Sequence, residues 1–211
     1  MAIEDEILAA LDPDQRAVAL ATRGPVCVIA GAGTGKTRAI THRIAYAAAI
    51  GTMDPQKVLA LTFTAKAAGE MRARLRSLGV PTVAARTIHS AALKQLLYFW
   101  PSVFGGRTPD LMTTKTGFLT EAINRAGLSG SLRATNRELM RDIASEIEWA
   151  KVSQVGPTDY IDEVSKRMQK PRVTPEQMVQ VYTAYESIKK QELAIDFEDV
   201  LLLCSAMMEE E

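Results

Sequence analysis

The chain has 211 residues, which allows one large domain, or a domain that carries a second one, with a sizeable buried core. Lys plus Arg and Asp plus Glu number 25 each, so no global basic field indicates a nucleic-acid partner, and any such site must be a local patch. The acidic N-terminus is unlike a signal peptide, and no apolar run reaches the roughly 20 residues of a membrane helix. Cys27 and Cys204 lie in apolar runs and are expected to be reduced core residues of a cytoplasmic protein.

The first half of the chain alternates predicted helices with short apolar runs that predict buried strands. Asp12 is expected to cap a helix that begins at Pro13, with Gln15 at the capping-box position. Alternating strands and helices favour a parallel sheet with right-handed crossovers. The predicted strands are residues 25–30, 58–63 and 83–88; the predicted helices are residues 35–50, with Ile40, Ile44 and Ala47 on one face, and residues 65–78.

The second half of the chain has a different character, because no convincing strand follows Lys94 for about a hundred residues. A loop over residues 104–110 is the expected junction. The last predicted helix begins with Thr174-Pro175-Glu176-Gln177, a strong helix start. The predicted helices are residues 113–126, 135–151, 158–168 and 174–193.

A glycine-rich turn stands between the first predicted strand and the next helix. Glycines let backbone N–H groups point at an anion, and the helix adds the positive end of its dipole. Lys36 is expected to reach the β- and γ-phosphates of a nucleotide, and the Thr37 hydroxyl to ligate Mg²⁺. The chain has Ala30 where the strict motif has glycine. The predicted phosphate site comprises Ala30, Gly31, Ala32, Gly33, Thr34, Gly35, Lys36 and Thr37.

Five stretches, taken in order, resemble the N-terminal part of the UvrD/Rep/PcrA family of superfamily 1 DNA helicases: "LDPDQRAVA", "AGAGTGKTRAITHRI", "VLALTFTAKAAGEMRARL", "ARTIHSAALKQL" and "IDFEDVLLL". "YFW" and "EIEWAK" are most similar to the actinobacterial UvrD-type branch. The resemblance implies an α/β fold: a P-loop NTPase with a RecA-like parallel sheet and an inserted all-helical subdomain. It places the first motor domain at residues 1–95, the insert at 96–193, and a return to the motor domain at 194–211.

The resemblance also implies roles for residues around the nucleotide. Gln15 matches the family glutamine that reads adenine, alongside its capping role. Arg38 matches the arginine that lies against the adenine ring, the alternative being a solvated first-turn side chain. ATP and Mg²⁺ are the implied cofactors, with Lys36 and Thr37 as the catalytic contribution of this half of the motor.

A second set of residues is implied to contact single-stranded DNA. Phe63 would stack on a base, the alternative being a core aromatic at the end of a strand. Ala65 replaces an asparagine of many relatives, so one polar contact is in doubt. His42 is interpreted as structural, and Arg72, Arg74 and Arg76 as a solvated face. The implied backbone contacts are Thr64, Lys66, Thr87, His89 and Ser90.

The "DFED" stretch is interpreted as a helix start capped by Asp196, and not as the aspartate that holds Mg²⁺ in P-loop enzymes. No Asp-Glu-x-Gln-Asp stretch occurs. The resemblance implies that the parent is an ATP-dependent 3′-to-5′ DNA helicase. Because that stretch is missing, this chain is expected to be an N-terminal part that turns over ATP poorly or not at all. Single-stranded and duplex DNA and other repair proteins are the expected partners. The alternatives are a non-catalytic nucleotide- or DNA-binding module, a small-molecule kinase, and the helicase subunit of a helicase–nuclease.

Overall fold

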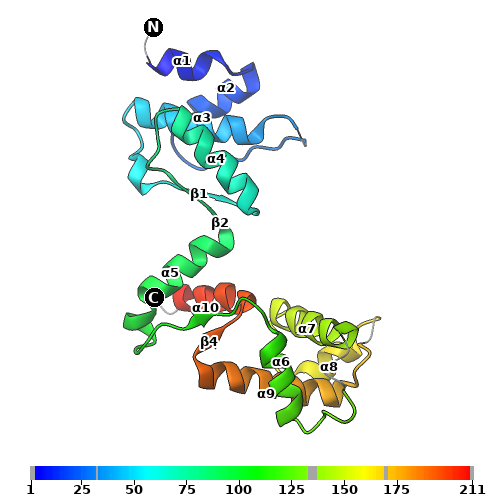
Figure 1. Cartoon of the computed structure of the whole chain (residues 1–211). Coiled ribbons are helices and arrows are strands. Elements are labelled where there is room, and N and C mark those ends of the chain that lie inside the picture. Colours follow the sequence, from blue (N-terminus) through cyan, green and yellow to red (C-terminus); the bar gives the residue numbers. More distant parts are fainter. Residues whose placement is uncertain (1–2, 32, 133–136, 169–170, 210–211) are drawn as a thin grey trace. The chain divides into compact units, whose positions relative to one another are not determined.

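The computed structural model describes residues 3–31, 33–132, 137–168 and 171–209 (Figure 1). The chain divides into two compact units, Met1–Ala91 and Ala92–Glu211, and the division falls inside the helix α5 (Ile88–Val103). Among the described residues, no helix combines the length and the apolar character that a membrane crossing requires.

The first unit contains a parallel pair of strands, β1 and β2, with a helix as the crossover between them. Leu59 is opposite Ala84 and Thr62 is opposite Thr87, so the two strands end side by side. The strands predicted at residues 58–63 and 83–88 are confirmed, with slightly shorter bounds. The helices predicted at residues 35–50 and 65–78 are confirmed as well, also slightly shorter. The elements of the unit are α1 (Ile3–Ala9), α2 (Pro13–Leu20), α3 (Lys36–Ala49), the 3₁₀ turn η1 (Pro55–Lys57), β1 (Leu59–Thr62), α4 (Ala65–Ser77) and β2 (Ala84–Thr87).

The core of the first unit lies where α1, α3 and α4 meet the two strands. Apolar side chains at helical spacing, such as Met71 and Leu75 on α4, face inward and exclude water. Glycine ends both long helices, since Gly51 and Gly79 have φ angles of +73° and +81°. The buried residues are Ile7, Ile44, Ala45, Ala60, Met71, Leu75, Val80, Val83 and Ala85.

Three expectations about this unit are wrong. Residues 25–30 form no strand, and Ile29 is 95% exposed. The strand β1 is only half buried, because Leu59 and Leu61 are exposed. Cys27 is also exposed and is therefore not a core residue. A continuous apolar run becomes a buried strand only where other strands pair with it and helices cover it. In the described part of this unit, β1 and β2 pair only with each other, so residues 25–30 have no ladder to join.

The second unit is mainly helical, as predicted, and all four predicted helices are present; three have shorter bounds, and the helix predicted at 135–151 ends one residue later, at Val152. The start of the helix predicted at 135 lies outside the described residues. A short parallel pair, β3 with β4, was not predicted, because strands of two residues leave no periodic signal. The elements after α5 are β3 (Asp110–Leu111), α6 (Thr116–Arg125), α7 (Arg137–Val152), α8 (Tyr160–Ser165), α9 (Pro175–Glu192), β4 (Ala194–Ile195) and α10 (Phe197–Glu209).

Two apolar clusters hold the second unit together. The larger lies between α6, α7, α8 and α9 and includes the fully buried Ile143, Ile147 and Tyr185. The smaller joins α5 to β4 and α10 through Leu96, Val200 and neighbouring side chains. Residues 194–209 therefore pack within this unit, where β4 pairs with β3. Their assignment to the first motor domain of the family fold stays a prediction.

Candidate functional site

The glycine-rich turn forms a tight loop at the start of α3. Gly33 and Gly35 have φ angles of +78° and +85°, which are strained for residues with a side chain and explain why glycine stands at both positions. The Thr34 hydroxyl donates a hydrogen bond to the Gly31 carbonyl oxygen at 2.9 Å and closes the turn. Ala32 lies outside the described residues. The loop thus leads directly into the N-terminus of a 14-residue helix, where partial positive charge gathers.

Lys36 is the first residue of α3, and its ammonium group lies over the loop. Its Nζ atom donates to the carbonyl oxygens of Ala30 at 2.8 Å and Gly31 at 2.5 Å. The positive charge is therefore held among backbone dipoles and within the turn. An anion that enters the loop meets both the helix N-terminus and this ammonium group.

Gln15 serves two purposes with two different groups. Its backbone N–H donates to the Asp12 side chain at 2.8 Å, which confirms Asp12 as the cap of α2. Its side chain, however, does not complete a capping box. The Gln15 Nε2 atom donates to the Thr34 carbonyl oxygen at 3.2 Å, across 19 positions of sequence. The first turn of α2 is thereby fastened to the phosphate loop.

A hollow of about 550 Å³ opens beside this contact. Gln15 and Lys36 both line it, so an amide and an ammonium group face one space together with an apolar wall. Thr37 and Arg38 lie next to this lining in the first turn of α3 and are exposed. The donor set suits a ligand with an anionic end and a polar, flat end, and the exposed Thr37 hydroxyl suits Mg²⁺. The lining residues are Asp12, Asp14, Gln15, Val18, Cys27, Val28, Ile29, Ala30, Thr34, Gly35, Lys36 and Ala39.

The side chains of Thr41 and His42 brace the first turns of α3. The Thr41 hydroxyl bonds to the Thr37 and Arg38 carbonyl oxygens at 2.9 and 3.0 Å, and His42 Nδ1 lies 2.8 Å from the Arg38 carbonyl oxygen. Burial lowers the pKa of His42 below its ordinary value, and the charge of Arg38 lowers it further. A buried histidine held neutral against its own helix has a structural role, which agrees with the prediction for His42.

The parallel register brings two of the predicted DNA-contact stretches to one edge of the sheet. Because Thr62 is opposite Thr87, the residues that follow each strand lie next to each other. Phe63 is 89% exposed, so it is not the core aromatic that was the alternative. Lys66 is also exposed, in the first turn of α4. Ligands in α/β sheets bind at the carboxyl ends of strands, which is where these side chains lie.

The hydroxyl groups at this edge also have local structural partners. Thr64 caps α4 by accepting a hydrogen bond from the Ala67 backbone N–H at 3.1 Å. Thr87 accepts from the Ser90 N–H at 3.1 Å, and the Ser90 hydroxyl donates back to the Thr87 carbonyl oxygen. His89, which stands between Thr87 and Ser90 in the sequence, is half buried. The Thr64 and Thr87 hydroxyls accept in their caps and still have a proton to donate to a bound phosphate, whereas the Ser90 proton is already donated to the Thr87 carbonyl oxygen.

Arg72 corrects the expectation that the arginines of α4 form only a solvated face. Its Nη1 atom donates to the Ala85 carbonyl oxygen at 2.8 Å and ties α4 to β2. All three arginines are exposed residues, as predicted. The sequence could not distinguish Arg72, because nothing in it shows which arginine lies near a carbonyl oxygen of another element.

The second unit contains a buried ion cluster that sequence reasoning missed. Lys151 of α7 and Lys189 of α9 are each 3% exposed and meet the 1% exposed carboxylate of Asp196. The Lys151 ammonium group lies 2.8 and 2.7 Å from the two Asp196 oxygens, and it also contacts Asp199 and Glu186. The three carboxylates have oxygens within 4.8 Å of one another, a spacing that could hold a metal ion, but two ammonium groups stand among them.

Mutual attraction sets the charges of this cluster. Burial by itself lowers the pKa of Lys151, but the surrounding carboxylates outweigh it and raise that pKa above its ordinary value. Burial by itself raises the pKa of Asp196, but Lys151 and Lys189 outweigh it and hold the pKa well below its usual range. The Tyr185 hydroxyl donates to Asp196 at 3.0 Å, and burial raises the pKa of that phenol.

Asp196 is also the helix cap that the sequence predicted. Its side chain accepts a hydrogen bond from the Asp199 N–H, and the Asp199 side chain accepts one from the Asp196 N–H, both at 3.0 Å. This reciprocal pair opens α10. Its partners are lysines of α7 and α9, which agrees with the interpretation that Asp196 is no Mg²⁺ ligand of the phosphate loop.

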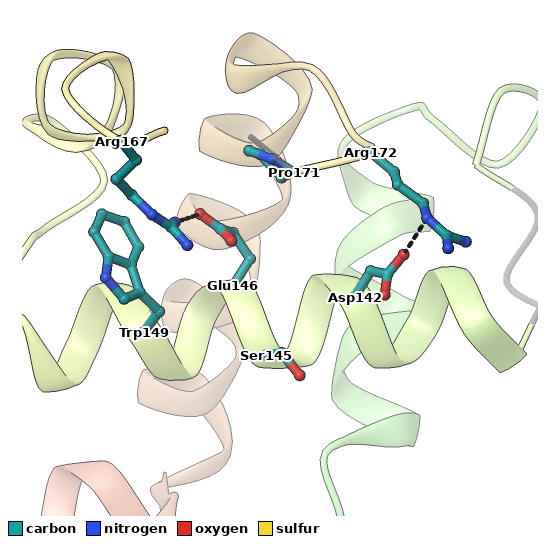
Figure 2. A pocket seen from close by; sticks show the side chains of 7 residues that line it. All are labelled: Asp142, Ser145, Glu146, Trp149, Arg167, Pro171 and Arg172. Carbon is teal, nitrogen blue, oxygen red and sulfur yellow. Dashed lines mark hydrogen bonds and ion pairs between the residues drawn. The ribbon is translucent and has the colours of Figure 1, made fainter. Parts of the chain in front are cut away.

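A second hollow, of about 340 Å³, lies on α7 and is shown in Figure 2. The Arg167 guanidinium carbon lies 3.8 Å from the centre of the Trp149 ring, and Arg167 donates to Glu146 at 2.5 Å. Arg172 pairs with Asp142 at 3.2 Å on the other side. Both arginines already have carboxylate partners, so among the described residues that line the hollow neither arginine is an unpaired positive charge for an anion. The "EIEWAK" stretch therefore supplies packing and ion pairs to the second unit.

Comparison with known proteins shows that the chain belongs to a family of ATP-dependent DNA helicases. Its residues 11–211 match the family described as the UvrD/REP helicase N-terminal domain. The chain is 44% identical to the ATP-dependent DNA helicase UvrD2 of Mycobacterium tuberculosis (strain H37Rv) over 216 aligned residues, 97% of this chain and 30% of that protein. It is 33% identical to the ATP-dependent DNA helicase PcrA of Leuconostoc citreum over 188 residues, 86% of this chain and 24% of that protein.

Proposed function

We propose that this protein is the ATP-binding and single-stranded-DNA-binding part of an ATP-dependent DNA helicase that moves in the 3′-to-5′ direction and works in cytoplasmic DNA repair. The observation that supports it most strongly is the hollow where Gln15 and Lys36 face one space beside the phosphate loop. A RecA-like motor domain is part of the proposal, supported by the parallel strands β1 and β2 and their crossover α4.

Each residue of the loop has a stated role in this proposal. Lys36 exchanges its two carbonyl partners for oxygens of the β- and γ-phosphates, because a bond between ammonium and phosphate is stronger than one to a neutral carbonyl. Gln15 offers an amide donor and acceptor to the edge of the adenine base. Arg38 lies against the ring. The Thr37 hydroxyl ligates Mg²⁺, which when bound neutralises phosphate charge.

The edge of the sheet supplies the DNA contacts of the proposal. Phe63 stacks on a base, since an exposed aromatic at a strand end is open to a flat partner. Lys66 and His89 add positive or polar groups for the phosphate backbone. The hydroxyls of Thr64 and Thr87 donate to phosphate oxygens while their oxygen atoms keep their capping bonds, and the Ser90 hydroxyl exchanges the Thr87 carbonyl oxygen for a phosphate oxygen.

ATP turnover by residues 1–211 alone is expected to be slow or absent. Hydrolysis in P-loop enzymes needs an aspartate for Mg²⁺ and an acidic or polar group to position water. The one deeply buried aspartate of the described residues, Asp196, is paired with Lys151 and Lys189 in the other unit. The relatives are more than three times as long as this chain, since it spans 30% of UvrD2.

Nucleotide binding is tested by calorimetry with Mg-ATP on the wild-type chain and on Lys36→Ala. The matched control is Lys57→Ala, which removes an 85% exposed lysine elsewhere in the same unit. Binding is expected for the wild type and the control and is expected to be lost in Lys36→Ala. Equal binding by all three chains would show that the loop is not the nucleotide site.

DNA binding is tested by the fluorescence anisotropy of labelled single-stranded DNA at two salt concentrations, with and without Mg-ATP. Phe63→Ala is compared with Tyr98→Ala, an exposed aromatic of the second unit that is outside the proposed site. Loss of one stacked base is expected to cost about 1–3 kcal/mol in Phe63→Ala only. The same loss in both variants, or in neither, would remove Phe63 from the proposed site.

A further inference from the structure

Arg43 lies on α3 and has none of the roles proposed above for the motif residues. Its side chain reaches across to the end of α2. Its Nε atom donates to the Ala21 carbonyl oxygen at 2.7 Å, and its Nη2 atom donates to the Gly24 carbonyl oxygen at 3.2 Å. Ala21 is the C-cap residue of α2. A guanidinium group at a helix C-terminus satisfies carbonyls that have no partner in the helix and opposes the negative end of its dipole.

The two ends of α2 are therefore both fastened to α3 and the loop before it. At the start, Gln15 bonds to Thr34 next to the phosphate loop; at the end, Ala21 bonds to Arg43. Along α2, six residues separate Gln15 from Ala21, about 9 Å at 1.5 Å per residue. Along α3, seven residues separate Lys36 from Arg43, about 10 Å on the same scale. The similar spans fit two helices that pack side by side with their first turns at the loop.

The contact between the Gln15 side chain and the phosphate loop is sterically tight. A Cβ atom at Gly35 would lie only 2.4 Å from the Gln15 Nε2 atom, so the amide is pressed against the loop backbone. Gln15 is moreover on the first turn of an eight-residue helix that packs along α3, so the position of its amide depends on how the two helices are set against each other. A small shift of α2 along α3 therefore changes where the Gln15 amide points.

We propose that Arg43 is a positioning residue: it sets the register of α2 against α3 and so places the Gln15 amide at the nucleotide hollow. The inference rests on the proposed function, in which the loop binds ATP and Gln15 reads adenine. Arg43 acts through α2, because it does not line the hollow and its guanidinium group bonds to Ala21 and Gly24 at the end of that helix. It therefore governs the choice of base and not the attraction of phosphate.

A double-mutant cycle tests the proposal. Affinities for Mg-ATP and Mg-GTP are measured by calorimetry for the wild type, Arg43→Met, Gln15→Ala and the double variant. Arg43→Met is expected to reduce the preference for ATP over GTP about fivefold, at the low end of couplings within one hydrogen-bonded network. In the Gln15→Ala background the same change is expected to leave the preference unaltered. An unchanged preference in Arg43→Met, or an equal loss in both backgrounds, overturns the proposal.

A matched control and a second readout separate positioning from general stability. Arg16→Met removes the same charge from an exposed position on α2 and is expected to leave the ATP preference unchanged. Hydrogen exchange is measured on the nucleotide-free chains, where α2 amides are expected to lose protection in Arg43→Met while α4 amides keep it. Arg43→Lys, which keeps the charge but not the fork of donors, is expected to be intermediate.

The two proposals fail in different ways. If the wild type binds ATP and GTP no better than Lys36→Ala does, the proposed function fails, and Arg43 is judged by hydrogen exchange alone. If ATP binds with a clear preference and α2 protection is the same in Arg43→Met as in Arg16→Met, the role of Arg43 fails and the proposed function stands.

Discussion

The two units of this chain differ in where their described charged side chains lie: exposed or half buried in the first unit, and in part buried in the second. Among the described residues, every buried lysine and carboxylate lies in the second unit, and the buried polar side chains of the first unit are Thr41 and His42. The first unit keeps Lys36, Phe63 and the strand ends exposed, where a ligand can reach them. In the second unit, the buried charged side chains form ion pairs with one another. Exposed polar groups are available for binding, whereas buried ion pairs specify how helices pack.

Breaking the ion cluster is expected to have the largest effect on this contrast. Lys151→Met leaves Asp196 and Asp199 with one ammonium partner fewer in a buried place, which is expected to cost about 3–5 kcal/mol of unfolding free energy. Both tryptophans, Trp100 and Trp149, belong to the second unit, so denaturant unfolding followed by fluorescence reports on it.

The control for this measurement is Lys166→Met, which removes a 66% exposed lysine of the same unit. A change near zero is expected, because surface ion pairs contribute little. If Lys151→Met is no more destabilising than Lys166→Met, the cluster does not hold the second unit together.

Acid is expected to separate the two units. The folded pKa of His42 is lowered, so the unfolded chain binds the extra proton and the first unit loses stability as pH falls from about 6.5. The folded pKa of Asp196 is lowered too, but its stabilisation is present above about 3.9 and lost only below it. Hydrogen exchange between pH 7 and pH 5 is thus expected to show weakening protection in α3 and unchanged protection in α7.

His42→Gln is the control for the acid experiment, since glutamine does not titrate. It is expected to flatten the pH dependence of α3 in this window. A slope that persists in His42→Gln would mean that another group of the first unit is responsible.

At the alkaline end the second unit is expected to weaken first. The folded pKa of Lys151 is raised, so its stabilisation is complete below about 10.4 and is lost as pH rises through the folded pKa. Burial raises the pKa of Tyr182 to about 12, which acts in the same direction. Fluorescence-detected unfolding at pH 9 and pH 11 checks this, and equal stability at both would contradict the charge assignment of the cluster.

A single hydroxyl tests the cluster more gently. Tyr185→Phe removes the donor to Asp196 and keeps the ring in the core, so a loss of about 1.5–3 kcal/mol is expected from the same unfolding curves. Tyr182→Phe is the comparison, because its hydroxyl bonds to the neutral Val155 carbonyl oxygen at 3.3 Å. A loss of only about 0.5–1.5 kcal/mol is expected there. A larger loss in Tyr182→Phe than in Tyr185→Phe would contradict the assignment of a negative charge to Asp196.

The smallest effect is expected in the first unit. Asp12→Ala removes the cap of α2 and its bond to the Gln15 N–H, which is expected to cost about 1 kcal/mol. Asp14→Ala removes a neighbouring acid that does not cap the helix and is expected to cost less. The helical circular-dichroism signal during thermal unfolding measures both, and equal midpoints would show that the cap contributes nothing.

Local signals in the sequence were sufficient for several of these features. Asp12 caps its helix as predicted, and Thr174 caps the helix whose start was predicted there, because capping depends on residues three positions apart. The phosphate loop could be recognised because its glycines, lysine and threonine stand within seven positions. The apolar run at residues 25–30 misled the prediction, because an apolar run indicates a strand only when partners for it exist.

Contacts between distant residues were beyond what the pattern could supply. Gln15 and Thr34, Arg43 and Ala21, and Lys151 and Asp196 are separated by 19, 22 and 45 positions. Nothing in a sequence pattern distinguishes Lys151 from a solvated lysine, or Arg43 from any arginine on a helix face. Their roles depend on which carbonyl or carboxylate the fold brings to within 3 Å.

By itself, the sequence determined the helices and their caps, the phosphate loop and the family, since each is written in neighbouring residues or in a fixed order of motifs. Only the tertiary structure decided that Gln15 turns to the loop, that Arg43 anchors the end of α2, and that two lysines are buried among three carboxylates. The physical reason is that hydrogen bonds and ion pairs act over a few ångströms of space, whatever their separation along the chain.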